Sequence, residues 1–291
     1  MMVIVTKLHC RSIYKDNMAS SHHTITRCME TGSASGDQAS NDRFRLHRFD
    51  IARVTTGMKA LIIGRRATGK SRLVKDILQH NRTIPIKVAI SPTERWNPEI
   101  GKEFPDVHFY DEYTPTISAK FVEMQETASK MLRKDEATSG RINPRGLDPR
   151  AIMVMEDCLY DTSWTKDKNM IKLFMNGRHY KSTLLITMQY QLDIPPALRK
   201  NIDFMFVLRE TNATSLKRIY DNANVSCSYE SFCHLIDIYT REYGCLVIDN
   251  TTTRSKFEDR VFWYRANDAG SVESAEMHHA SKKRRVDDGK D

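Results

Sequence analysis

The chain has 291 residues, and 40% of them are hydrophobic, which is enough for one well-packed core with appended segments. No apolar stretch approaches the length of a membrane span, and the apolar run at residues 1–5 is too short for the core of a signal peptide. The 6 cysteines include no Cys-x-x-Cys pair and match no usual zinc site. We therefore expect a soluble, intracellular protein with reduced thiols.

The net charge of +8 is unevenly distributed along the chain. Residues 1–42 contain equal numbers of basic and acidic side chains, and so do residues 269–291. The positive excess therefore lies in residues 43–268. A basic folded domain favours a polyanionic partner, because phosphates that are neutralised by a protein release their counterions. An ordinary basic surface is the alternative.

Composition also divides the chain into three parts. Residues 1–42 and 269–291 are rich in small polar and charged residues and show little periodicity, which predicts a flexible N-terminal arm and a flexible C-terminal tail. Residues 43–268 are expected to form the folded domain. A basic cluster at residues 282–285 of the tail is either solvated charge or a signal for nuclear import or nucleic-acid contact.

Between the arms, short apolar segments alternate with segments of helical periodicity. The apolar segments predict strands at residues 58–64, 86–90, 151–155, 183–188 and 203–208. The helical segments are residues 69–80, 117–132, 166–178 and 211–221, the last with Thr211 as N-cap. A helix at 229–240 and strands near 245–248 and 260–264 follow. Because several strands are apolar on both faces, we predict an α/β fold with a mostly parallel sheet sandwiched between helices.

The sequence GRRATGKS at residues 64–71 matches the pattern of a phosphate-binding P-loop, with an apolar strand before it and a helix after it. Its glycines allow the backbone to direct N–H groups at phosphate oxygens, and the helix N-terminus adds its dipole. We expect Lys70 to contact the β- and γ-phosphates of ATP, and Ser71 to be a ligand of Mg²⁺. The candidate nucleotide-binding residues are Gly64, Arg65, Arg66, Ala67, Thr68, Gly69, Lys70, Ser71 and Arg72.

Two carboxylates, Glu156 and Asp157, directly follow the expected strand at 151–155. In a P-loop ATPase one such acid orients the Mg²⁺ shell and a second polarises the attacking water. The order Glu-Asp is unusual, and it leaves open which carboxylate has which role. The alternative is a pair that only caps a loop or helix.

Two further polar residues flank the expected strand at 183–188. Gln189 lies at its end, where a side chain can sense the γ-phosphate or hold the water. Arg178 precedes it, where a helix ends at the sheet edge, and there an arginine can reach the nucleotide of a neighbouring subunit. The alternative for Arg178 is a cation that interacts with the helix dipole.

These segments together resemble the FtsK/HerA superfamily of P-loop motors, in which an arginine, a sensor glutamine and an Ile-Pro turn precede the next strand, as in residues 176–210 here. Within that superfamily, residues 44–78 and 90–113 are similar to the DNA-packaging ATPases of large nucleocytoplasmic DNA viruses, the poxvirus-type packaging ATPases. The resemblance covers residues 44–264. It implies a P-loop NTPase fold of the ASCE type, with an extra strand between the P-loop strand and the acidic strand.

The resemblance also implies a function. It is that of an ATP-driven, ring-forming motor that moves double-stranded DNA into a capsid without regard to sequence, in an infected cell or the virion, with capsid or virion proteins as partners. Lys70 and Ser71 would hold phosphate and Mg²⁺. Glu156 and Asp157 would be the acidic pair, Gln189 the sensor and Arg178 the arginine that acts in trans.

Other segments are less specific for this function. Thr93 and Glu94, after the second strand, are expected near the nucleotide. Arg141, Arg145 and Arg150 lie among Gly and Pro residues in a segment that is either a basic pore loop or an ordinary surface loop. Arg199 and Lys200 are either DNA contacts or surface charges.

Two other classes of P-loop protein compete with the motor. A small-molecule kinase would need a lid and an acceptor pocket, and no arginine-rich lid is evident. A nucleotide-dependent virion scaffold without catalysis does not need the intact set of Lys70, Ser71, Glu156 and Asp157. A GTPase is disfavoured, because the sequence lacks the Asn/Thr-Lys-x-Asp element that reads guanine.

Overall fold

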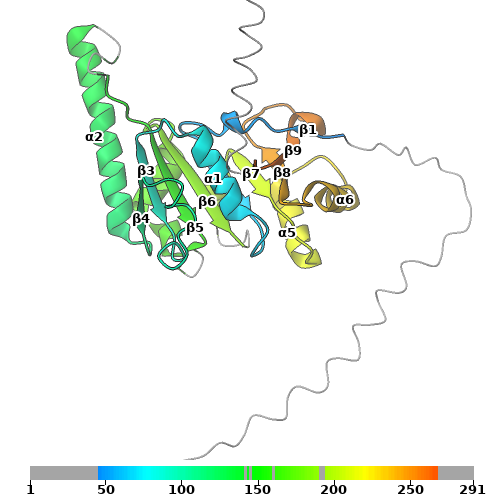
Figure 1. Ribbon diagram of the computed structural model, residues 1–291. Helices are drawn as coiled ribbons and strands as arrows, with labels where there is room; N and C mark the ends of the chain where they lie inside the picture. The colour runs from blue at the N-terminus through cyan, green and yellow to red at the C-terminus, as the bar shows by residue number, and fades with distance from the viewer. Residues whose placement is uncertain (1–44, 141–142, 144–145, 159–160, 190–193, 268–291) are drawn as a thin grey trace, which may run out of the picture. The chain divides into compact units, whose positions relative to one another are not determined.

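The computed structural model describes residues 45–267 except 141–142, 144–145, 159–160 and 190–193 (Figure 1). The expected arms, residues 1–42 and 269–291, lie outside the described residues. Within the described part, nine strands form one sheet in the order β1-β9-β8-β7-β2-β6-β5-β3-β4. Neighbouring strands are parallel except in the pairs β7–β8 and β8–β9. The predicted α/β fold with a mostly parallel sheet is confirmed.

The predicted elements are present in the expected order, and β1, β4 and α4 occur in addition to them. The strands are β1 (His47–Arg48), β2 (Lys59–Ile63), β3 (Ile86–Ile90), β4 (Val107–Tyr110), β5 (Ala151–Glu156), β6 (Ser182–Met188), β7 (Phe204–Val207), β8 (Gly244–Asp249) and β9 (Val261–Arg265). The helices are α1 (Lys70–His80), α2 (Pro115–Ser139), α3 (Lys168–Asn176), α4 (Pro196–Arg199), α5 (Ala213–Ala223) and α6 (Tyr229–Tyr239). Short 3₁₀ helices are η2 (Ile51–Arg53), η4 (Ser163–Lys166) and η6 (Phe257–Asp259).

Two buried clusters cover the two faces of the sheet. Successive side chains of a strand point to opposite faces, so Leu61 and Ile63 of β2 join one cluster while Ala60 and Ile62 join the other. The first cluster includes apolar residues of α2, α3, α5 and α6, and the second includes those of α1. Figure 1 shows α1 in front of the sheet. The sheet is therefore covered on both faces, as the apolar strands predicted.

The strand order places the polar residues of interest. Strand β6 lies between β2, which leads into the P-loop, and β5, which ends at the acidic pair. This is the inserted strand of the ASCE arrangement. Because these strands are parallel, their carboxyl ends meet at one edge of the sheet, and ligands of open α/β sheets bind at that edge.

Some boundaries differ from those expected. Helix α5 has Asn212 as its N-cap, not Thr211, because the Asn212 side chain accepts a hydrogen bond from Ser215 N at 3.0 Å. The Thr211 amide instead donates to the Glu210 carboxylate at 2.7 Å. Helix α2 continues to Ser139, and Figure 1 shows its final turns beyond the sheet. Among the described residues, no helix has the length and apolar character that crossing a membrane requires.

Candidate active site

The loop between β2 and α1 has the backbone of a phosphate cradle. A Cβ atom at Gly64 would lie 2.6 Å from Thr68 Oγ1 and 2.8 Å from Leu208 Cβ, so only glycine fits there. Ala67 and Gly69 have φ angles of 62° and 105°, in the left-handed region. Helix α1 begins at the next residue, so its first N–H groups point into the loop.

Lys70 is held at the mouth of this loop. Its residue is 6% exposed, and Nζ donates to the carbonyl oxygens of Gly64 at 3.1 Å and Arg65 at 3.4 Å. The Asp157 carboxylate lies 3.6 Å from the same Nζ atom. A buried ammonium that faces neutral carbonyl groups is suited to an anionic ligand, because charge-assisted contacts with phosphate are stronger than those with a carbonyl.

Glu156 is the last residue of β5 and is buried. Its Oε1 atom accepts a hydrogen bond from Ser71 Oγ at 2.6 Å, and its Oε2 atom accepts one from Ser91 Oγ at 3.0 Å. Burial raises the pKa of this carboxyl, and the two serine hydrogen bonds only partly oppose the shift. The fold thus places the P-loop hydroxyl directly against the first carboxylate of the acidic pair.

Asp157 has a different environment. Its backbone has a φ angle of 47°, and its amide donates to Thr187 Oγ1 of β6 at 3.1 Å. Its Oδ1 atom is buried and has no hydrogen-bond partner, and Lys70 Nζ lies 3.6 Å from it. A left-handed backbone and a buried carboxylate oxygen without a hydrogen bond are features that cluster at functional sites.

Ser71 and the acidic pair fit a magnesium ion. Mg²⁺ prefers hard oxygen donors, usually one or two protein groups with phosphate oxygens and water. Within the described ranges, no group of three or more His, Cys, Asp or Glu side chains has the geometry to hold a metal alone. Ser71 Oγ, with the Glu156 carboxylate directly against it, therefore suits an ion that takes its remaining ligands from water and a phosphate chain.

Two hydroxyl groups of this site were not among the residues predicted from the sequence. Ser91 follows β3 and binds Glu156, and Thr187 of β6 binds the Asp157 amide. Of the expected pair after β3, Thr93 Oγ1 lies 3.3 Å from Ser91 Oγ. Glu94 instead accepts hydrogen bonds from the backbone of Ile100 and Gly101, so its carboxylate braces its own loop. Position after a strand at the P-loop edge is the signal that could have identified Ser91.

Gln189 and Arg178 lie at opposite ends of β6. Gln189 directly follows the strand and is half-buried at the P-loop edge. Arg178 precedes the strand and pairs with the buried Asp203. Strand β2 has 5 residues, so at about 3.3 Å per residue the two edges are roughly 16 Å apart. Arg178 therefore lies away from the P-loop of its own chain.

The three arginines of the segment that is either a pore loop or a surface loop are only partly described. Arg141 and Arg145 lie outside the described residues. Arg150 pairs with both carboxylate oxygens of Asp148, at 2.7 and 2.9 Å, and donates to Thr83 O at 3.1 Å. Its guanidinium thus fixes the segment before β5 to the loop before β3. Arg199 similarly contacts Asn222 of α5.

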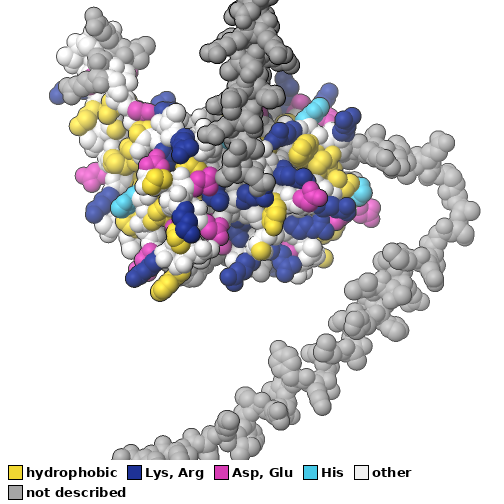
Figure 2. Space-filling view, in the orientation of Figure 1, with side chains coloured by type: hydrophobic (Ala, Val, Ile, Leu, Met, Phe, Trp, Pro, Cys, Tyr) yellow, Lys and Arg dark blue, Asp and Glu magenta, His cyan; other side chains and the backbone are white. Residues whose placement is uncertain are grey.

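Basic side chains also surround the P-loop. Arg65 and Arg66 are exposed, and Arg65 donates to Thr211 Oγ1 at 3.0 Å. Arg209 and Arg241 share the carboxylate of Asp237. Figure 2 shows several Lys and Arg side chains over the region of α5 and α6, with acidic side chains among them. The P-loop side of the domain is accordingly suited to anions.

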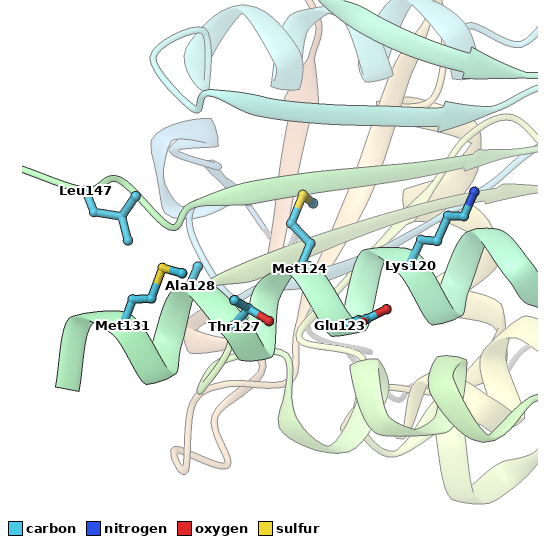
Figure 3. A pocket seen from close by; sticks show the side chains of 7 residues that line it. All are labelled: Lys120, Glu123, Met124, Thr127, Ala128, Met131 and Leu147. Atoms are coloured by element: carbon cyan, nitrogen blue, oxygen red, sulfur yellow. The ribbon is translucent and has the colours of Figure 1, made fainter. Parts of the chain in front are cut away.

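A separate groove of about 410 Å³ runs along α2. Figure 3 shows Leu147 pointing toward Ala128 and Met131 of the helix. No P-loop residue contributes to its lining, which consists of Lys120, Glu123, Met124, Thr127, Ala128, Met131 and Leu147. The groove and the candidate nucleotide site are therefore distinct surfaces.

Comparison with known proteins places the chain among viral proteins. A search of protein-family models finds no match. An uncharacterized protein of Acanthamoeba polyphaga mimivirus is 32% identical over 243 residues, which cover 81% of this chain and 84% of that protein. An uncharacterized protein of Invertebrate iridescent virus 6 is 34% identical over 219 residues, 75% of this chain and 78% of that protein. The chain belongs to this family of nucleocytoplasmic large DNA virus proteins.

Solved structures show the fold that this viral family shares with other nucleotide-binding proteins. The pCW3 conjugation coupling protein TcpA, in a monomer form with ATPγS, matches 75% of this chain and 62% of its own, with 14% identity and a TM-score of 0.52. The genome packaging NTPase B204 from Sulfolobus turreted icosahedral virus 2, in complex with AMPPCP, matches 72% and 98%, with 14% identity and a TM-score of 0.47. The likeness to TcpA, together with the strand order, gives this chain a P-loop NTPase fold.

Proposed function

We propose that this protein is an ATPase that moves double-stranded DNA into a viral capsid. One observation carries the catalytic part: the sheet brings Lys70, Ser71 and the acidic pair together at one edge, with hydroxyl and carboxylate in contact. The DNA part rests on the basic domain, on the resemblance to packaging ATPases and on the viral family. Membership in a motor ring, contact with capsid or virion proteins and action in the infected cell are parts of the same proposal.

Each residue has a defined task in the hydrolysis that we propose. The loop amides and Lys70 hold the β- and γ-phosphates of ATP, and Ser71 with Glu156 orients the magnesium shell. Magnesium, when bound, supplies positive charge that offsets the charge on the phosphate oxygens. Both oxygens of Glu156 are occupied by serine hydroxyls, so Asp157 is the better candidate to polarise the attacking water. Gln189, at the end of β6, helps to position this water.

Arg178 acts, in this proposal, on the nucleotide of a neighbouring subunit. It lies at the edge opposite its own P-loop, and its side chain is 58% exposed although it pairs with Asp203. A guanidinium that projects from this edge can reach a neighbour and stabilise the transition-state charge. DNA contact would be sequence-independent, through phosphates, as a packaging motor requires.

The deciding experiment measures steady-state ATP hydrolysis with and without double-stranded DNA. We expect DNA to stimulate the wild type, and Lys70→Ala and Arg178→Ala each to lower the rate about 10³-fold or more. Arg150→Ala is the matched control, because Arg150 also pairs with an aspartate near the amino ends of the strands, and it should retain the wild-type rate. Hydrolysis that ignores DNA would favour a kinase-like P-loop enzyme, and the absence of hydrolysis would favour a nucleotide-dependent virion scaffold.

A further inference from the structure

The turn between α6 and β8 lies beside the P-loop. Strand β8 runs antiparallel to β7, with Val207 opposite Leu246, so β8 begins at the edge where β7 and β2 end. In the sheet, β7 is on the other side of β2 from β6 and β5. The turn therefore flanks the P-loop on the side away from the acidic pair.

Tyr243 is the residue of this turn that reaches the loop. A Cβ atom built on Gly69 would lie 3.2 Å from both Cβ and Cδ1 of Tyr243, which means that the tyrosine packs directly against the P-loop backbone. The Arg72 guanidinium carbon lies 5.3 Å from the centre of the tyrosine ring. Even so, Tyr243 is 51% exposed to solvent. Few other large hydrophobic residues in the described part of the chain are as exposed.

The backbone of the turn holds Tyr243 in this position at a cost. Glu242 and Tyr243 have φ angles of 50° and 62°, a conformation that non-glycine residues rarely adopt. Two contacts fix it: the Glu242 carboxylate pairs with Arg265 at 2.9 Å, and Gly244 N donates to Arg241 O at 2.9 Å. Strain of this kind persists where it serves a site, and here it exposes an aromatic ring beside a phosphate cradle.

The direction of a bound nucleotide follows from the charges. Lys70, Ser71 and Asp157 mark where the terminal phosphates lie, on the β6–β5 side of the loop. A nucleoside attached to the other end of the phosphate chain must leave the loop on the opposite side, toward β7 and the turn before β8. We propose that the base of the nucleoside triphosphate stacks on Tyr243. This inference rests on the proposed nucleotide-hydrolysing function.

The chemistry of the ring suits this role. Every nucleobase has a flat π-face, and an aromatic side chain binds it without regard to hydrogen-bond pattern. Arg72, at the first turn of α1, places a cation near the same ring and near the phosphate chain. Tyr243 would thus contribute to nucleotide affinity, whereas hydrolysis depends on the residues at the other side of the loop.

The test compares binding of two ligands by calorimetry: ATP, and inorganic tripolyphosphate, which lacks the base and ribose. We expect Tyr243→Ala to weaken ATP binding about 5- to 150-fold and to leave tripolyphosphate binding unchanged, since that is the range that one base–aromatic stack contributes. Tyr243→Phe should restore the affinity for ATP. Trp96→Ala removes another exposed aromatic side chain, beyond β3 at the same edge, and should alter neither ligand.

The outcomes separate the alternatives. Equal weakening of both ligands in Tyr243→Ala would show that the ring only supports the loop, and it would overturn the assignment. Unchanged ATP binding would overturn it as well. A wild type that binds neither ligand would overturn the proposed nucleotide-hydrolysing function itself, and the stacking role with it.

Discussion

At the scale of single residues, the two carboxylates of the acidic pair have unlike surroundings. Glu156 is hydrogen-bonded through both oxygens to Ser71 and Ser91, whereas Asp157 keeps a buried oxygen without a hydrogen-bond partner. The chain order Glu-Asp left their division of labour open. The contacts favour Glu156 as the partner of the magnesium shell and Asp157 as the residue that acts on water.

Neutral isosteres should separate these two roles. We expect Asp157→Asn to lower kcat about 10²- to 10⁴-fold with ATP affinity retained, because it removes a base that acts in the transition state. Glu156→Gln should instead raise the Mg²⁺ concentration for half-maximal activity about 10- to 100-fold, since it disturbs the orientation of Ser71. Magnesium titrations of the hydrolysis rate measure both. The assignment is wrong if Asp157→Asn changes mainly the magnesium requirement.

The raised pKa of Glu156 also predicts how the Glu156→Gln variant changes the stability of the fold. Because burial raises the pKa in the folded state, the carboxyl favours folding when protonated, and this contribution is lost as the pH rises through the raised pKa. A glutamine side chain at this position does not titrate, so Glu156→Gln should be at least as stable as the wild type at pH 7 in the absence of ligands. Thermal unfolding at pH 4.5 and pH 7 checks this direction.

At the scale of elements, one buried hydrogen bond joins α1 to β9. Tyr264 OH donates to Asp76 Oδ2 at 2.5 Å, and both residues are buried. Burial raises the pKa of Asp76, and Tyr264, His80 and Arg48 oppose that rise by favouring the ionised carboxylate. The helix that carries Lys70 and Ser71 is therefore connected to the far half of the sheet through a hydrogen bond whose strength depends on pH.

Removal of this hydroxyl should destabilise the fold in a pH-dependent way. We expect Tyr264→Phe to lower the free energy of unfolding by about 1.5–3 kcal/mol where Asp76 is ionised, and by only about 1 kcal/mol where it is protonated. The cost should thus grow as the pH rises through the raised pKa of Asp76. Tyr220→Phe is the control, because Tyr220 OH donates to the neutral Cys227 O at 2.6 Å. Urea unfolding at pH 4 and pH 8 measures the free energy of unfolding of both variants. If Tyr264→Phe loses the same free energy at the two pH values, the hydrogen bond to Asp76 does not depend on pH.

The sequence predicted the interior elements better than the peripheral ones. Strands β2, β5, β6 and β7 are buried on both faces, so their apolar runs were sufficient. Strand β4 was not expected, because at the edge of the sheet it is only partly buried and includes His108. Strand β1 has 2 residues, too few for any periodicity.

For the site, spacing along the chain predicted the P-loop, and an apolar run followed by two acids predicted the acidic pair. Ser91 and Thr187 were missed because hydroxyl residues are common, and only the pairing of β3, β5 and β6 brings these two to the acids. Tyr243 was missed because its place in the site also depends on strand pairing. Its proximity to Gly69 depends on the antiparallel return of β8, which no local pattern encodes.

At the scale of the whole molecule, the proposed catalytic groups occupy two edges of one sheet. The P-loop and acidic pair lie at the carboxyl ends of the strands, and Arg178 lies at the amino end of β6 beside Lys59 and Asp203. Burial lowers the pKa of Lys59, and the nearby Arg178 charge lowers it further. Asp203 thus contacts both Lys59 and Arg178. Arg178 can therefore bind a group of another subunit while Lys59 continues to pair with the Asp203 carboxylate.

This separation predicts complementation between two inactive variants. Lys70→Ala subunits lack a working P-loop but retain Arg178, and Arg178→Ala subunits have the reverse defect. If the site forms between subunits, a mixture contains interfaces where an intact P-loop meets an intact Arg178, so ATP hydrolysis should exceed the sum of the separate preparations. Mixing Lys70→Ala with Asp157→Asn is the control. In this mixture every subunit lacks either Lys70 or Asp157, which both lie on the P-loop side of the site. No interface then has a complete set of catalytic groups, and activity should stay low. Equal failure of both mixtures would mean that Arg178 only stabilises its own subunit through Asp203.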